Sequence, residues 1–242
     1  MKKVSLLGFA WIALRSVGVT FMSSCAALWL ARGKNDRAAI DALTRNWSQK
    51  LLDIIKLRYR VVGELPRYQP GRRYIIMCSH ASHYDIPLSF VALPGSIRML
   101  AKKELSQIPV FGRAMSRSEF IFIDRLNRER ALSDLSAARA KMEDGIVLWV
   151  APEGTRSKDG KLLPFKKGCF HLALDTQAII IPIGIRDIVN VLPKGTLNMY
   201  SGVAVEMHIG AMIDASEYSM QTRDRLMQTV EAEMRRVLNQ PK

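Results

Sequence analysis

The chain has 242 residues, of which 48% are apolar, and it carries a net charge of +14 with an isoelectric point near 10.0. This length suffices for one sizeable domain plus an appendage, and the charge indicates an anionic partner such as nucleic acid, an acidic membrane surface or a phosphorylated substrate. The three cysteines, Cys25, Cys78 and Cys169, include no C-x-x-C pair, which argues against a disulfide framework and a structural zinc site and favours a reducing compartment.

The first quarter of the chain is the most basic part and also holds the longest apolar stretch. Residues 1–62 carry eleven Lys or Arg against three Asp, a net charge of +8. The stretch 4–31, interrupted by Arg15, would be about 42 Å long as one helix, longer than the roughly 30 Å hydrocarbon core of a bilayer. A charge at the centre of a span costs about 2.5–3.5 kcal/mol. We therefore expect a segment that dips into one leaflet, with a single span or a cleaved signal as alternatives.

A second helix is expected over residues 35–60. Apolar residues recur there at spacings of three and four, which marks one face of a helix: Ile40, Leu43, Trp47, Leu51 and Ile54. The opposite face is basic. The helix could pack on the domain or lie as a basic amphipathic helix on an anionic membrane, and the neighbouring apolar stretch favours the membrane. We divide the chain into N-terminal membrane-associated helices (1–62) and a catalytic domain (63–242).

From residue 63 onward, short β-branched runs alternate with helical patterns. Strands are expected at 74–79, 97–102, 119–124, 146–151, 178–185 and 203–209. Helices are expected near 84–92, 107–116, 127–143, 169–176 and 216–238. Near-continuous apolar strands between helices predict an α/β fold with a mostly parallel sheet flanked by helices.

Polar residues follow several of these strands. In parallel sheets the ligand crevice lies outside the carboxyl ends of the strands, so side chains at those ends should converge on one rim. The candidates are His80, Asp85, Lys102, Lys103, Arg125 and the run Pro152 to Ser157. The sequence thus predicts a histidine, two carboxylates and several cations at one edge of the sheet.

The His80–Asp85 pair is the candidate for acid–base chemistry. A carboxylate bonded to one ring nitrogen fixes the tautomer of the imidazole, and the other nitrogen can then take a proton from a hydroxyl. Alternatively, Asp85 only caps a helix beside a half-buried His80. His83 is expected to be a rim or packing residue. A metal site of these three residues is conceivable, but His171 and His208 stand alone in the sequence and suggest no further ligand.

The segment 151–168 has the composition of a phosphate-binding loop. Gly154 allows close approach of the backbone to a ligand, and Arg156 can bind a phosphate through a two-pronged hydrogen bond. Arg125 could bind the same phosphate. Alternatively, Glu153 forms a structural ion pair with Arg125 or Arg156.

Four blocks occur in a fixed order: S-H-x-S-x-x-D at 79–85, F-I-D-R at 122–125, P-E-G-T-R-S at 152–157 and I-P-I-G at 181–184. Together they resemble the four blocks of the glycerolipid acyltransferases, above all of the 1-acyl-sn-glycerol-3-phosphate acyltransferases, over roughly residues 63–210. Three positions depart from the family. Ser79, Ala81 and Ala151 stand where many members have Asn, Gln and an aromatic residue, which leaves the exact acceptor open.

The resemblance implies the αβ acyltransferase domain, with His80 as general base oriented by Asp85. The substrate-binding residues expected from the resemblance and the rim are Lys102, Lys103, Arg125, Glu153, Gly154, Thr155 and Arg156. The implied reaction moves an acyl chain from acyl-CoA or acyl carrier protein to the free hydroxyl of a lysophospholipid. The acceptor would be 1-acyl-sn-glycerol-3-phosphate and the product phosphatidic acid, with no metal or other cofactor.

The same resemblance implies that the N-terminal helices dock on an anionic lipid surface, at the cytoplasmic face of the inner membrane. Three other functions remain as alternatives. The acceptor could be another lysolipid such as an amino-acid lipid, or the His–Asp pair could activate water in a thioester hydrolase. A nucleic-acid-binding protein would also explain the charge, but no recognised motif of that class occurs and the charge clusters beside an apolar segment.

Overall fold

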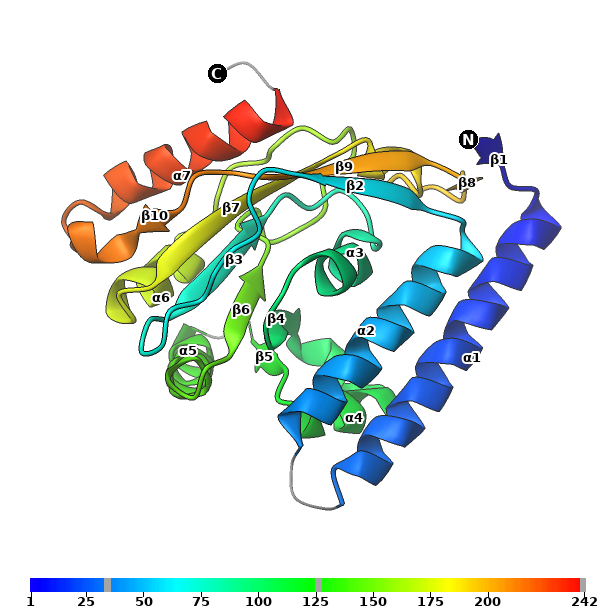
Figure 1. Ribbon diagram of the computed structural model, residues 1–242, viewed down its shortest axis with the longest axis horizontal. Helices are drawn as coiled ribbons and strands as arrows, with labels where there is room; N and C mark the ends of the chain where they lie inside the picture. Colours follow the sequence, from blue (N-terminus) through cyan, green and yellow to red (C-terminus); the bar gives the residue numbers. More distant parts are fainter. Residues whose placement is uncertain (33–35, 125–127, 240–242) are drawn as a thin grey trace.

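The computed structural model describes residues 1–32, 36–124 and 128–239 (Figure 1). The helices are α1 (Leu6–Leu30), α2 (Arg37–Ile54), α3 (Asp85–Ala92), α4 (Phe111–Arg117), α5 (Arg128–Glu143), α6 (Gly168–Asp175) and α7 (Arg223–Leu238). The strands are β1 (Lys2–Lys3), β2 (Arg58–Val62), β3 (Tyr74–Cys78), β4 (Ile97–Lys102), β5 (Ile121–Ile123), β6 (Val147–Val150), β7 (Ile179–Arg186), β8 (Tyr200–Ser201), β9 (Ala204–Ile209) and β10 (Ile213–Asp214). Short 3-10 turns lie at Lys103–Gln107, Ile188–Asn190 and Ala215–Glu217.

The main sheet has the strand order β2-β9-β7-β3-β6-β4-β5, with β10 beside β7. Strands β3 to β7 are parallel, whereas β2 and β9 run parallel to each other and antiparallel to β7. The mostly parallel sheet predicted from the sequence is confirmed. The carboxyl ends of five strands therefore meet at one edge, which is the edge that carries the candidate site.

Both faces of the sheet are covered by helices, which explains the continuous apolar strands. On one face of β3, the side chains of Tyr74, Ile76 and Cys78 pack in the hydrophobic core between the sheet and helices α1, α2 and α3. Ile75 and Met77, which alternate with them, belong to the core under α5, α6 and α7 (Figure 1). All five side chains are buried, so the strand has no polar face.

The helix expected over 35–60 is shorter than predicted. α2 ends at Ile54, Lys56 adopts a left-handed conformation, and residues 58–62 form β2, which pairs with β9. The helical assignment of residues 58–60 was therefore wrong, because the next strand begins directly after the turn. The domain division at residue 62 stays a prediction. β2, which precedes this boundary, pairs with β9, which follows it, so the main sheet includes residues from both sides. Smaller differences are that α4 begins at Phe111 and α7 at Arg223.

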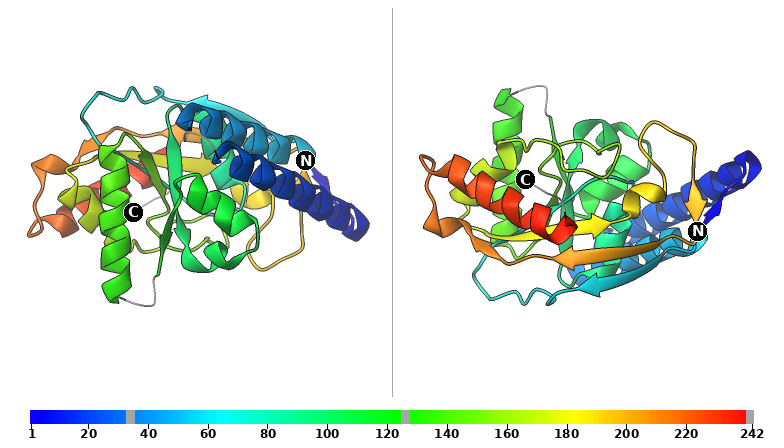
Figure 2. Two further views of the ribbon diagram at one scale, coloured as in Figure 1. Left: turned by 90° about the horizontal axis from the view of Figure 1, so that it is seen from below. Right: turned by 90° about the horizontal axis from the view of Figure 1, so that it is seen from above.

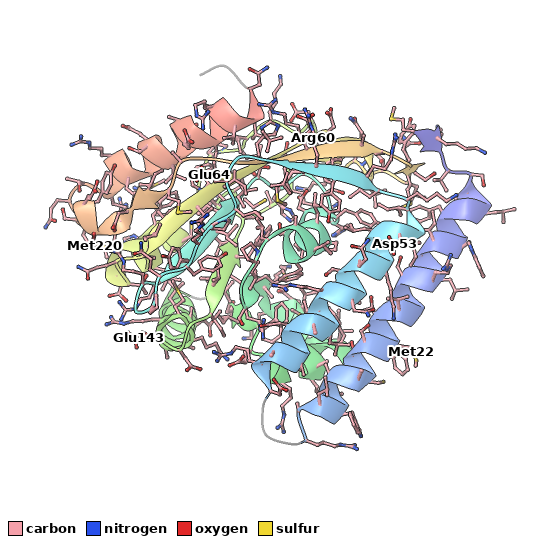
Figure 3. All side chains as sticks on the ribbon, viewed as in Figure 1. Met22, Asp53, Arg60, Glu64, Glu143 and Met220 are labelled. Atoms are coloured by element: carbon pink, nitrogen blue, oxygen red, sulfur yellow. The ribbon has the colours of Figure 1, made fainter. Side chains whose placement is uncertain are left out.

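The apolar face of α2 packs on the protein, so the expectation that this face binds a membrane was wrong. Ile40 and Leu51 are buried, and α2 lies against both α1 and α3. The helix that exposes apolar side chains is α1, at one edge of the molecule (Figure 2). Its exposed apolar residues are Leu6, Leu7, Trp11, Leu14, Val17, Phe21, Met22 and Trp29. Figure 3 shows Met22 on the outer side of α1.

A buried ionic network fastens α2 to the rest of the protein. Arg98 on β4 is fully buried; its Nη1 lies 2.6 Å from Asp41 Oδ1 on α2, and its Nε donates to the Ser118 carbonyl at 2.6 Å. Glu119 accepts two hydrogen bonds from Arg37, at 2.9 and 2.8 Å. The network joins α2 to β4 and to the turn before β5.

We predict that Asp41→Asn lowers the free energy of unfolding by about 3 kcal/mol, because it leaves the buried Arg98 charge without full compensation. The Asp41 carboxylate also accepts a hydrogen bond from the Ser96 hydroxyl. In the variant the asparagine has only one amide oxygen, so it cannot accept from both Ser96 and Arg98 through separate oxygens. Urea unfolding in detergent measures the change. The matched control is Asp53→Asn at the exposed end of the same helix (Figure 3), where the expected change is within about 0.5 kcal/mol. Equal stabilities of the two variants would contradict the prediction.

Candidate active site

His80 leaves the sheet at the carboxyl end of β3 and is held there through its neighbour. The Ser79 N–H donates to the Ile183 carbonyl at 2.9 Å, and the Ser79 hydroxyl accepts from the Ile185 N–H at 3.1 Å. Both contacts are with β7, the adjacent strand. The serine at this position therefore extends the strand pairing by one residue and fixes where His80 begins.

The His80 ring is oriented by Asp85, the first residue of α3. His80 Nδ1 lies 2.7 Å from Asp85 Oδ2, which also accepts from the backbone N–H groups of Ala81 (2.8 Å) and Ser82 (2.9 Å). Asp85 is fully buried, whereas the His80 side chain is 17% exposed. Because a carboxylate only accepts hydrogen bonds, Nδ1 carries the proton of the neutral ring and Nε2 is an acceptor. The structure thus brings the predicted pair together, with Nε2 as the acceptor nitrogen, while the role of His80 as a general base stays a prediction.

Glu153 binds the backbone of the same residue, His80. Its Oε1 accepts from the His80 N–H and its Oε2 from the Leu163 N–H, each at 2.9 Å. The side chain is buried, and this burial raises the pKa of Glu153 to about 7. The two backbone contacts use both carboxylate oxygens, and the described residues show no ion pair with Arg156. Substrate binding by Glu153 stays a prediction, while its visible contacts brace the backbone.

The P-E-G-T-R-S turn is tied directly to His80. Gly154 has a φ of +71°, and its N–H donates to the Ala151 carbonyl at 3.0 Å. The Ser157 N–H donates to the His80 carbonyl at 2.7 Å. Arg156 is therefore the residue directly before Ser157, whose backbone binds that of the candidate base.

Arg156 forms no ion pair with any residue that the structure describes. It lies close enough to His83 to contribute to the lowering of the pKa of that imidazole, after desolvation, which is the larger cause. His83 is exposed at the rim, as expected, and the ring that contacts Asp85 is that of His80. Among the described residues Arg156 is therefore a cation without an ion-pair partner, near His83 and one residue before the Ser157 contact with His80.

Lys194 also belongs to the site, and the sequence analysis missed it. Its Nζ donates to Thr155 Oγ1 at 2.8 Å and to the Arg156 carbonyl at 2.9 Å. The residue lies in the loop after β7, about 40 residues along the chain from the turn that it binds. No spacing pattern could have connected the two, because the contact depends on how that loop folds back.

The remaining candidates lie on neighbouring strand ends. Lys103 Nζ lies 2.9 Å from Asp124 Oδ2, and Lys102 Nζ lies 3.0 Å from Glu104 Oε1. Neither contact involves His80, and the substrate-binding role of both lysines stays a prediction. Arg125 lies outside the described residues.

An apolar groove leads from the rim along α1. Its volume is about 550 Å³, and His83 and Tyr84 are among the residues that line it. Apolar side chains of α1 and α2, Pro87 of α3 and the segment 108–111 form its walls. The lining is mostly apolar, and His83 brings the groove within three residues of His80 along the chain.

The cysteines offer no nucleophile in this site. Cys78 is fully buried in β3, and burial raises the pKa of its thiol well above the usual value. Within the described ranges, no group of three or more His, Cys, Asp or Glu side chains is placed to hold a metal ion. The arrangement therefore favours a base that acts on a substrate hydroxyl or on water.

Comparison with known proteins identifies relatives of the chain. Residues 58–186 match the family described as Acyltransferase. The 1-acyl-sn-glycerol-3-phosphate acyltransferase of Haemophilus influenzae is 33% identical over 180 residues, which cover 73% of this chain and 72% of the relative. The human 1-acyl-sn-glycerol-3-phosphate acyltransferase alpha is 37% identical over 135 residues, or 55% of this chain and 47% of the human protein.

Structural comparison extends the match to almost the whole chain. A crystal structure of the 1-acyl-sn-glycerophosphate acyltransferase of Thermotoga maritima superimposes with a TM-score of 0.78 at 25% sequence identity, covering 96% of this chain and 94% of that one. Several sequence relatives are longer: the matched region spans 40% of a putative Caenorhabditis elegans homologue and 36% of one from Cocos nucifera.

Proposed function

Because the chain belongs to the acyltransferase family, we propose that it transfers an acyl chain from a thioester to the free hydroxyl of a lysophospholipid. The acceptor that we favour is 1-acyl-sn-glycerol-3-phosphate, which the names of several relatives specify. The observation that carries the proposal is that three features lie together: the His80–Asp85 pair, Arg156 without an ion pair among the described residues, and an apolar groove lined in part by His83. The pair would act as the base, Arg156 would bind the phosphate of the acceptor, and the groove would hold its alkyl chain.

In the proposed reaction, His80 Nε2 removes the proton of the acceptor hydroxyl. The oxygen forms a bond to the thioester carbonyl carbon, and backbone N–H groups near the rim stabilise the negative charge on the carbonyl oxygen. The carbon–sulfur bond then breaks, and the thiolate of CoA or acyl carrier protein receives the proton from His80. The Asp85 carboxylate stabilises the imidazolium that exists between the two proton transfers.

The proposed position on the membrane follows from α1. Its exposed apolar side chains would enter the lipid, each contributing about 1.5–3 kcal/mol if fully buried. α1 is long and apolar enough to cross a bilayer, yet α2 and α4 pack beside it. We therefore favour a helix that lies in one leaflet, since a span would separate it from these neighbours. The groove along α1 would then open toward the lipid that supplies the acceptor. Location at the cytoplasmic face, where acyl-CoA and acyl carrier protein occur, is part of the proposal.

The function is tested with purified protein, labelled acyl-CoA and a panel of lysolipids in vesicles. We predict that His80→Ala folds normally and loses at least about 100-fold in transfer rate, the usual scale for a general base. His83→Ala is the matched control, because His83 lies on the same rim without the Asp85 contact, and it should keep most of the activity. An active His80→Ala together with an inactive His83→Ala would reverse the assignment.

We also predict that Arg156→Lys weakens the use of a phosphorylated acceptor by about ten- to a hundredfold in kcat/KM, since lysine cannot reproduce the two-pronged bond to a dianion. An uncharged lysolipid with the same acyl chain should be affected much less. Acceptor kinetics and a melting curve for the variant provide the measurement. Equal losses on both acceptors, with a lower Tm, would show that Arg156 only holds the loop.

A further inference from the structure

Lys194 is a cation whose visible partners are both neutral oxygen atoms. Its ammonium group donates to the Thr155 hydroxyl and to the Arg156 carbonyl, and in the described part of the chain it forms no ion pair. The side chain is half-buried, so it is not a freely solvated surface lysine. A half-buried ammonium group that makes no ion pair among the described residues can accept an anionic ligand as a partner.

The two contacts of Lys194 fall on both sides of the Arg156 Cα atom. Thr155 is held through its side chain and Arg156 through its carbonyl, while the next residue, Ser157, donates to the His80 carbonyl at 2.7 Å. Arg156 is thus fixed between Lys194 and the backbone of the candidate base. Its guanidinium stays free of ion pairs within the described residues, which leaves its fork available for a ligand.

The loop that carries Lys194 also reaches the apolar groove. Leu192 and Met199 line the groove, and the Met199 carbonyl accepts from the Val4 N–H at 2.9 Å, just before α1. The following strand β8 pairs with β1 (Figure 1). One loop therefore contacts the P-E-G-T-R-S turn, the wall of the groove and the start of the membrane-facing helix.

We propose that Lys194 is a positioning residue that holds the Thr155–Arg156 turn in place for the phosphate of the acceptor and supplies a second positive charge to it. This role rests on the proposed function. Thr155 and Arg156 lie in the turn that resembles the family's block, whereas Lys194 comes from the loop after β7 and lies outside all four blocks. The side chains of Glu153 and Ser157 brace the two ends of this turn, whereas Lys194 binds it at Thr155 and Arg156. Lys194 therefore influences how Arg156 meets the anion.

The test uses Lys194→Met, which removes the ammonium but keeps the aliphatic chain, and Lys194→Arg, which keeps the charge and the donors. The matched control is Lys161→Met: Lys161 lies near the turn that Lys194 binds, but its side chain is 78% exposed and its ammonium group lies 4.0 Å from Asp159 and not at Thr155 or Arg156. Each variant is assayed with a lysophospholipid that bears a phosphate monoester and with a monoacylglycerol of the same chain, in identical vesicles. If Lys194→Met does not fold, Lys194→Gln takes its place.

For Lys194→Met we expect the KM for the phosphorylated acceptor to rise by at least about tenfold, with kcat changed less than about threefold and the uncharged acceptor little affected. Lys194→Arg should recover most of the loss, and Lys161→Met should behave as the unmodified protein does. If Lys194→Met instead matches Lys161→Met, or if both acceptors lose equally with a lower Tm, the positioning role is overturned.

A binding measurement separates this inference from the proposed function. The phosphorylated lysolipid is titrated into His80→Ala protein with and without Lys194→Met. Weaker binding in the double variant supports the inference even if the unmodified protein transfers no acyl chain, an outcome that would contradict only the proposed function. Equal binding by the two proteins would overturn the role of Lys194 whether or not transfer occurs.

Discussion

The Asp85 carboxylate accepts hydrogen bonds from the His80 ring and from two backbone N–H groups, and one of its oxygens receives all three. A buried carboxylate is costly unless it is bonded in this way, so the turn between β3 and α3 has little freedom to rearrange. The first turn of a helix also favours a negative charge. The position and tautomer of His80 follow from this one buried group, and the rest of the site is arranged around His80.

Three further contacts join the base to other parts of the fold. Glu153 binds the His80 N–H, Ser157 binds the His80 carbonyl, and Ser79 connects the residue before it to β7. These partners follow strands whose side chains are buried on both faces, and such strands move little. The apolar groove is lined by His83 next to this site and by α1, a helix with an exposed apolar face. The fold therefore places the His80–Asp85 pair between an apolar groove and the turn that carries Arg156.

The sequence predicted features that depend on local spacing. The apolar run at 74–79 indicated a buried strand, and five residues between His80 and Asp85 were enough to suggest their pairing across a strand-to-helix turn. The partner that covers an apolar helix face depends on residues far away in the chain, so local spacing cannot predict it. Ile40 and Leu51 define a helix face equally well whether it meets a membrane or α1 and α3, and the structure shows the second. Contacts such as Arg98–Asp41 and Lys194–Thr155 join residues far apart in the chain and leave no periodic trace.

Nitrogen NMR of the histidine side chains gives the most direct test of the claim that Asp85 makes His80 a base at Nε2. The protein is labelled with 15N-histidine, and the His80 signals are identified by their loss in His80→Gln. At about pH 8, above the ordinary pKa of histidine, we predict a proton on His80 Nδ1 and none on Nε2. In Asp85→Asn this preference should be weakened or reversed. A proton on Nε2 in the unmodified protein, or a tautomer unchanged by Asp85→Asn, would contradict the claim.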